Sequence, residues 1–156
     1  MRKSEREVKN LEDIVDILNR CETVRIGING NNDYPYVVPL SFGYEVADGK
    51  VVIYVHGAKE GLKHDLIARN NKVCVEADIF HRYAETGHSV TTEYESIIGF
   101  GIAQKADHDD TIKGLDLLLA HCKTEGYSAV ECAARGMTTV YKIMLDSITG
   151  KKRVVD

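Results

Sequence analysis

A glycine-rich turn between an apolar strand and a helix is the part of this sequence best suited to chemistry. The run Val51–Val55 is β-branched and aromatic, which predicts a strand, and residues 62–70 predict a helix. The residues that mark the turn are His56, Gly57, Ala58, Gly61 and Lys63. Glycines at such a turn tolerate backbone angles that a side chain would forbid. A helix N-terminus exposes unpaired N–H groups and a partial positive charge, so this turn favours a phosphate or another small anion.

The same segment also has an ordinary structural interpretation. Strand, glycine turn and helix is a common connection, in which Lys63 is a solvated helix residue and His56 a hydrogen-bonded residue at a strand end. The sequence has no G-x-G-x-x-G motif, which argues against a dinucleotide held on a Rossmann-type helix.

Composition and charge exclude several classes of protein. The 156 residues carry a net charge of −4 and scattered lysines and arginines, apart from the short basic tail 151–153, which argues against a nucleic-acid-binding protein. The charged N-terminus and the lack of a long apolar run predict no signal peptide and no membrane span. The cysteines form no C-x-x-C pair and fit no zinc template, so we expect no metal site and a reducing, cytoplasmic location; they are Cys21, Cys74, Cys122 and Cys132.

Hydrophobic patterning predicts a single domain, 1–156, that is mainly β with inserted helices. Six strands are expected at 23–28, 34–45, 51–56, 73–77, 94–103 and 138–145. Helices are expected at 11–20, at 62–70, after Asp107–Asp110, and as a shorter segment from Ser128 to Gly136. Short antiparallel strands that curve at glycines favour a small six-stranded barrel.

Two further expectations concern irregular segments. Pro39 cannot donate a ladder hydrogen bond, so it marks a break that frees backbone groups. The polar residues 79–93 predict a long loop that would select the substrate. Glu93 and Glu95 are expected to be solvated charges at a strand edge. Tyr141 is expected to be first of all an aromatic residue of a strand, and only secondarily a candidate to stack on a ligand.

The order of these motifs resembles one known family, the FMN-binding split-barrel proteins related to pyridoxamine 5'-phosphate oxidase, and within it the nitroimidazole-resistance type. The resemblance spans about residues 2–151, nearly the whole chain. It is carried by the segments 34–42, 55–63, 73–76, 94–101 and 148–151, which read YPYVVPLSF, VHGAKEGLK, VCVE, YESIIGFG and ITGK.

This resemblance implies a six-stranded antiparallel split β-barrel that forms a homodimer, with one FMN in each of two clefts between the subunits. It places the edge of the flavin ring near Val38, Pro39, Leu40 and Ser41. It places the phosphate and its surroundings near His56, Gly57, Ala58, Gly61 and Lys63, and makes Ser96 a candidate for the opposite wall. The family's arginine-rich phosphate clamp is reduced here to Lys63, with Arg25 as a second candidate.

The function implied is an FMN-dependent oxidoreductase that passes electrons to a small-molecule acceptor such as a nitroaromatic. His56 is the only histidine that we consider as a catalytic group, because it can titrate near neutral pH. Two alternatives stay open. One is a flavin carrier or sensor without turnover. The other is a haem-binding barrel whose axial ligand is His56, His81, His88 or His121.

Overall fold

The computed structural model describes residues 3–124, 126–131 and 133–155, so Cys132 lies outside the described residues. Its strands are β1 (Glu7–Val8), β2 (Val24–Ile28), β3 (Tyr36–Leu40), β4 (Phe42–Ala47), β5 (Lys50–Ala58), β6 (Lys72–Thr86), β7 (Ser89–Lys105) and β8 (Thr138–Arg153). Its helices are α1 (Leu11–Arg20), α2 (Leu62–Arg69) and α3 (His108–His121), with short 3₁₀ helices η1 (Ser4–Arg6) and η2 (Ala133–Met137). None of the described helices is long and apolar enough to cross a membrane.

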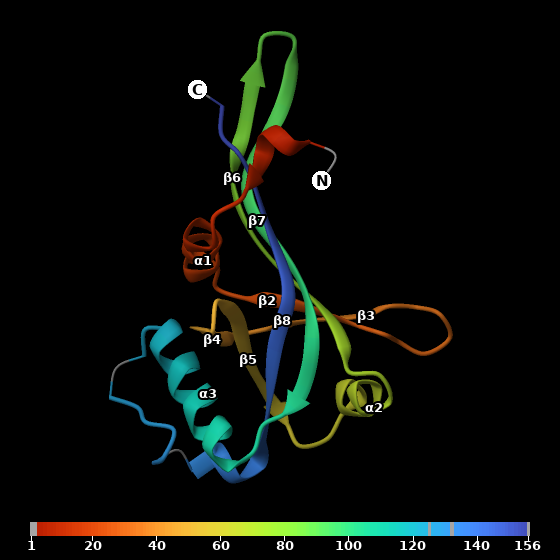
Figure 1. Ribbon diagram of the computed structural model, residues 1–156, viewed down its shortest axis with the longest axis vertical. Coiled ribbons are helices and arrows are strands. Elements are labelled where there is room, and N and C mark those ends of the chain that lie inside the picture. Colours follow the sequence, from red (N-terminus) through yellow and green to blue (C-terminus); the bar gives the residue numbers. More distant parts are fainter. Residues whose placement is uncertain (1–2, 125, 132, 156) are drawn as a thin grey trace.

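All the strands belong to one antiparallel sheet that closes on itself. The strand order is β3-β2-β6-β7-β8-β5-β4, and β1 pairs with β8. The two end strands of this order, β3 and β4, are consecutive in the chain and are separated by Ser41 alone. Because one residue spans less than 4 Å, the sheet must curl until the end of β3 lies beside the start of β4. No ladder joins these two strands in the described structure, so their free edges stay unpaired. The result is a barrel (Figure 1).

Alternation along the strands builds the core inside this barrel. On β2, Val24, Ile26 and Ile28 are buried and the residues between them are more exposed. On β5 both faces are buried, since Val52 and Tyr54 form a second apolar cluster that includes Leu115 and Leu117 of α3. Helix α3 therefore covers the outer face of the sheet at β5, and the inward faces form the main core.

The expectation of six strands is corrected to eight. One reason is the short β1; the other is that the expected strand 34–45 is divided at Ser41 between β3 and β4. Pro39 does not mark the break, since it lies within β3 and is paired with Arg25 of β2. Proline is tolerated there because β3 is an end strand of the described sheet.

Residues 79–93 are not a loop. They belong to β6 and β7, whose pairing continues to Thr86 and Ser89. These strands form a long hairpin arm that extends beyond the barrel, at the end opposite α2 and α3 (Figure 1). The arm has little core to face, so its residues lack the apolar alternation that would have predicted strands. The short helix expected from Ser128 is also absent from the described residues, where the 3₁₀ helix η2 follows a turn.

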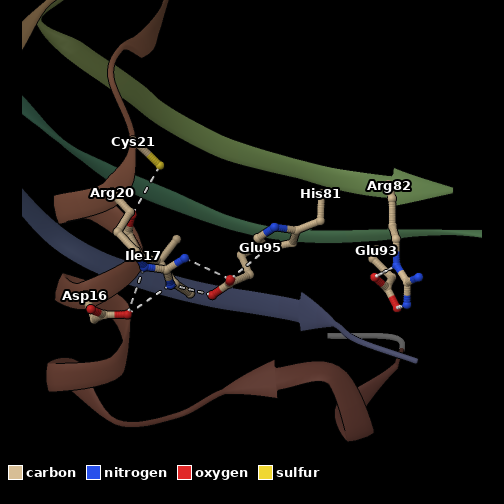
Figure 2. A network of polar contacts seen from close by, with 8 residues as sticks. All are labelled: Asp16, Ile17, Arg20, Cys21, His81, Arg82, Glu93 and Glu95. Atoms are coloured by element: carbon tan, nitrogen blue, oxygen red, sulfur yellow. Dashed lines mark hydrogen bonds and ion pairs between the residues drawn. The ribbon is translucent and has the colours of Figure 1, made fainter. Parts of the chain in front are cut away.

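Glu93 and Glu95 are not solvated charges. The Glu93 side chain is buried and accepts hydrogen bonds from Arg82, at 2.6 and 3.2 Å, and from the Val155 backbone N–H. Arg20 of α1 donates to both oxygens of Glu95, at 2.9 and 2.7 Å, and His81 Nε2 lies 2.9 Å from Oε1 (Figure 2). These contacts attach helix α1 to the base of the arm.

We predict that Glu95→Gln destabilises the protein at neutral pH. The hydrogen bonds from Arg20 hold the pKa of Glu95 at about 2, below its ordinary value of 4.5. A lowered folded-state pKa adds stability that is complete above pH 4.5 and is lost as the pH falls toward 2. The substitution should cost about 2 kcal/mol of unfolding free energy at neutral pH, because it removes charge-assisted hydrogen bonds.

Urea unfolding at neutral pH and at about pH 2 measures this difference. The gap between wild type and Glu95→Gln should close at the acidic pH. Asp16→Asn is the matched control, since Asp16 bonds the same arginine but is exposed, so its loss should cost less than about 1 kcal/mol. A gap for Glu95→Gln that is equally large at both pH values would contradict the prediction.

Candidate functional site

The strand–turn–helix segment forms as predicted, with β5 ending at Ala58 and α2 beginning at Leu62. Gly61 precedes the helix with a φ of 137°, a backbone conformation that side chains rarely adopt. Gly57 does not need an unusual backbone angle, since it lies in regular β5 opposite Thr139 of β8. Of the two glycines, only Gly61 therefore serves the conformational role expected from the sequence.

Gly57 is required for space instead. A Cβ built on this residue would collide with the Nζ and Cε atoms of Lys63. The lysine side chain therefore folds back from the first turn of α2 and lies against the backbone of β5. Any residue larger than glycine at position 57 would displace its ammonium group.

Lys63 and His56 meet at the edge of a small apolar cavity. The cavity of about 10 Å³ is lined by residues of β2, β3, β5, α2 and β8, namely Ile26, Ile28, Val38, Leu40, Val55, His56, Lys63, Ile67, Tyr141 and Ile143. This volume holds at most one water, so a ring-bearing ligand does not fit inside the barrel of one chain. Such a ligand would lie over the outer side of these residues.

The electrostatics of this corner are positive. Lys63 has no carboxylate within 4 Å among the residues that the structure describes. Burial and the neighbouring ammonium of Lys63 lower the pKa of His56, which is therefore neutral at pH 7. The Nδ1 atom of His56 is buried without a hydrogen-bond partner in the described structure. An uncompensated cation beside an unpaired imidazole nitrogen is suited to an anionic ligand with hydrogen-bonding groups.

A histidine–tyrosine pair also lies beside this corner and was not predicted. His64 follows Lys63 on α2, and its Nδ1 lies 2.9 Å from the hydroxyl of Tyr141 on β8, with the two rings stacked. Burial raises the pKa of Tyr141. The pair links the start of α2 to the sheet and so supports the position of Lys63. Nothing in the sequence spacing connects position 64 with position 141.

The structure brings together only part of the predicted site. Val38, Leu40, His56 and Lys63 line the same cavity, and Gly57 contacts Lys63. Pro39, Ser41 and Ala58 are adjacent to these residues in the chain, and Gly61 precedes Lys63 by two residues. Ser96 is elsewhere in the chain, in β7 between Asp78 of β6 and Lys151 of β8.

Arg25 is not available as a second phosphate-binding cation. Its guanidinium lies 3.1 Å from Glu76 and 2.6 Å from Asp78, so two carboxylates compensate its charge. Among the described residues no group of three or more His, Cys, Asp or Glu side chains could hold a metal ion. The cation of this corner is therefore Lys63.

Comparison with known proteins assigns the chain to a family. Residues 10–152 match the sequence model of the family described as pyridoxamine 5'-phosphate oxidase. A search of curated protein sequences gives no significant match.

Solved structures show the same fold. A protein from Bacteroides thetaiotaomicron, provisionally assigned to 5-nitroimidazole antibiotic resistance, is 28% identical with a TM-score of 0.79, over 93% of this chain and 85% of that chain. An FAD-binding protein from Mesorhizobium loti is 19% identical with a TM-score of 0.67, over 96% and 98%. An FAD- and haem-binding protein from Mycobacterium smegmatis is 14% identical with a TM-score of 0.76, over 96% and 74%.

The fold and the sequence lead to the same assignment. The antiparallel sheet that closes through Ser41 is the split-barrel fold of these structural neighbours. The family match covers all the described strands except β1 and the last residue of β8. The chain therefore belongs to the pyridoxamine 5'-phosphate oxidase family.

Proposed function

We propose that this protein binds FMN and is an oxidoreductase that reduces a small acceptor, with nitroaromatic compounds as the first class to test. The proposal rests on the family and on the 28% identity to a protein provisionally assigned to 5-nitroimidazole resistance. It also rests on the corner formed by β3, β5 and α2. When bound, the flavin would supply the electron-transfer chemistry, and the protein would bind and orient it.

The observation that carries the proposal is the uncompensated charge of Lys63. Its ammonium lies on the backbone of Gly57, beside the first turn of α2. Apart from the N–H of His64, which donates to Gly61 O, the first N–H groups of this helix have no helical partners. Helix N–H groups and a lysine together favour a dianionic phosphate. His56 would add a hydrogen bond through its buried, unpaired Nδ1. These residues would hold the phosphate of FMN.

The unpaired edge of β3 is suited to bind the ring of the flavin. Strand β3 pairs with β2 on one side and is an end strand of the described sheet, so its other backbone edge is open to a ligand. The pyrimidine part of a flavin needs such N–H and C=O groups. Val38 and Leu40 present a partly exposed apolar surface next to this edge. Residues 38–41 would therefore hold the edge of the ring.

We predict that Lys63→Ala weakens FMN binding more than riboflavin binding, because only FMN carries the phosphate. A charge-assisted contact of this kind contributes about 1.5–3 kcal/mol, or roughly ten-fold to one-hundred-fold in Kd. Quenching of flavin fluorescence measures both ligands. Lys59→Ala is the matched control, since Lys59 is exposed in the same turn and should change neither Kd. Equal losses for the two flavins would show that Lys63 does not contact the phosphate.

The same titration separates the proposal from its alternatives. No quenching at micromolar protein would remove flavin binding altogether. Tight binding of FMN without consumption of a nicotinamide donor or a nitroaromatic would leave a carrier or sensor. A Soret band on addition of haem, lost when one histidine is replaced, would favour a haem protein.

We also propose that two copies associate through the outer face of the sheet. Helix α3 covers this face at β5 and at the start of β8, where Val140 belongs to the same cluster, but the face stays exposed at β3, at β7 and at Met144 of β8. It carries large exposed apolar side chains, which are Val37, Ile98, Phe100 and Met144. A cleft of about 530 Å³ lies on this face between Phe100 and Gly27. A contiguous apolar surface of this kind is typical of a subunit interface.

Phe100→Lys is predicted to shift the protein from dimer to monomer in sedimentation equilibrium. Replacing a central aromatic side chain by a charge should cost about 2 kcal/mol or more of association free energy. Val46→Lys is the control, because Val46 is similarly exposed but lies on β4 opposite the core residue Val51. A wild-type protein that is monomeric and still binds FMN tightly would contradict the association and leave the flavin site intact.

A further inference from the structure

Basic side chains from three segments converge at the base of the hairpin arm. The N-terminal 3₁₀ helix, β1 and the end of β8 lie beside this base (Figure 1). In the register of β7 and β8, Tyr94 is opposite Arg153, and Ser96 is opposite Lys151. Side chains in such register point to the same face of the sheet. Arg6 of η1 approaches the same tyrosine.

Tyr94 is the centre of this cluster. The Lys151 ammonium lies over the Tyr94 ring at 5.6 Å from its centroid. Lys151 and Arg6 both lie close enough to Tyr94 to lower the pKa of its hydroxyl. Burial raises the pKa of Tyr94, but these two cations lower it by more, so the net shift is downward.

Carboxylates of the described residues compensate this cluster weakly. Among these residues, Glu5 is the one that forms an ion pair with the cluster, at 3.8 Å from Arg6, and its side chain is largely exposed. Glu7 is opposite Lys151 in the register of β1 and β8, yet no ion pair joins them in the described structure. The nearby Glu93 and Glu95 are held by Arg82 and by Arg20 with His81.

The cations are also partly withdrawn from water. The Arg6 side chain is only 17% exposed, Lys151 is partly buried, and Arg153 Nε is buried without a partner in the described structure. Partly buried like charges repel one another more strongly than solvated ones. An anion that enters between them would gain charge-assisted hydrogen bonds.

An apolar wall continues from the cluster along the arm. Tyr83 and Val90 are about 70% exposed, and Tyr83 packs edge-to-face on Phe80 with ring centroids 5.1 Å apart. A cleft of about 450 Å³ lies beside this wall and is lined by Arg6, Tyr83, Val90, Thr91, Thr92 and Tyr94. Lys151 is next to the cleft, over the ring of Tyr94. The cleft thus has a flat apolar side and a cationic end.

We propose that this cleft is a second ligand site, which binds an oxyanion carried on an aromatic ring, such as an aryl phosphate or an aryl carboxylate. The ring lies against Tyr83 and Val90, and the oxyanion is bound by Arg6 and Lys151. The basic tail 151–153 of the sequence thereby acquires a role through Lys151. The site is independent of the flavin proposal, since it uses neither Lys63 nor His56.

Phenyl phosphate, benzoate and inorganic phosphate are the probes, titrated into the full-length protein and followed by amide chemical shifts in NMR. Shifts are expected to concentrate at residues 90–94 and 151–153, with phenyl phosphate binding more tightly than inorganic phosphate because of the ring. Comparison of phenyl phosphate with benzoate distinguishes a phosphate from a carboxylate ligand. Lys151→Gln should weaken phenyl phosphate about ten-fold.

Matched variants decide the outcome. Lys152→Gln removes the same charge one residue away, opposite Glu95, and should change the affinity less than about two-fold. Tyr83→Ser, at an exposed position that tolerates substitution, should weaken phenyl phosphate but not inorganic phosphate. Lys63→Ala should have no effect, which separates this site from the flavin site. Absence of shifts at millimolar phenyl phosphate, or equal losses for Lys151→Gln and Lys152→Gln, would overturn the proposal.

Discussion

The closure of the sheet at Ser41 is the constraint on which the rest of the structure depends. Strands β3 and β4 are the two ends of the strand order, and a single residue joins them. Since β4 pairs with β5, this link brings Val38 and Leu40 of β3 to the cavity that Val55 and His56 of β5 also line. Residues that would be at opposite ends of an open sheet thus become neighbours at one corner.

Helix α2 adds the charge to this corner. Its first turn carries Lys63, and the side chain reaches back over Gly57 of β5, where any Cβ would collide with it. The hydrogen bond between His64 and Tyr141 holds the same turn against β8. The corner combines an open strand edge, an apolar surface and an uncompensated cation. These features match the polar edge, the ring and the phosphate of a flavin mononucleotide, which is why we propose FMN as the ligand.

The sequence was sufficient for features that depend on local pattern. The helices at 11–20 and 62–70, the strand–turn–helix at Gly61 and the barrel architecture were all predicted and are confirmed. Features that depend on distant partners were missed. No local signal shows that the two halves of a long polar segment pair as a hairpin arm. Nor does one show that Glu93 and Glu95 are hydrogen-bonded by arginines, or that His64 is hydrogen-bonded to Tyr141. Gly57 was predicted to be important for its backbone angle, whereas the structure requires it for space.

A crystal structure of the protein with FMN would show whether the phosphate of the flavin mononucleotide binds at Lys63. We expect the phosphate within hydrogen-bonding distance of Lys63 Nζ and the first amides of α2, with the ring edge along residues 38–41. A phosphate located elsewhere, with Lys63 in contact with solvent alone, would contradict this expectation.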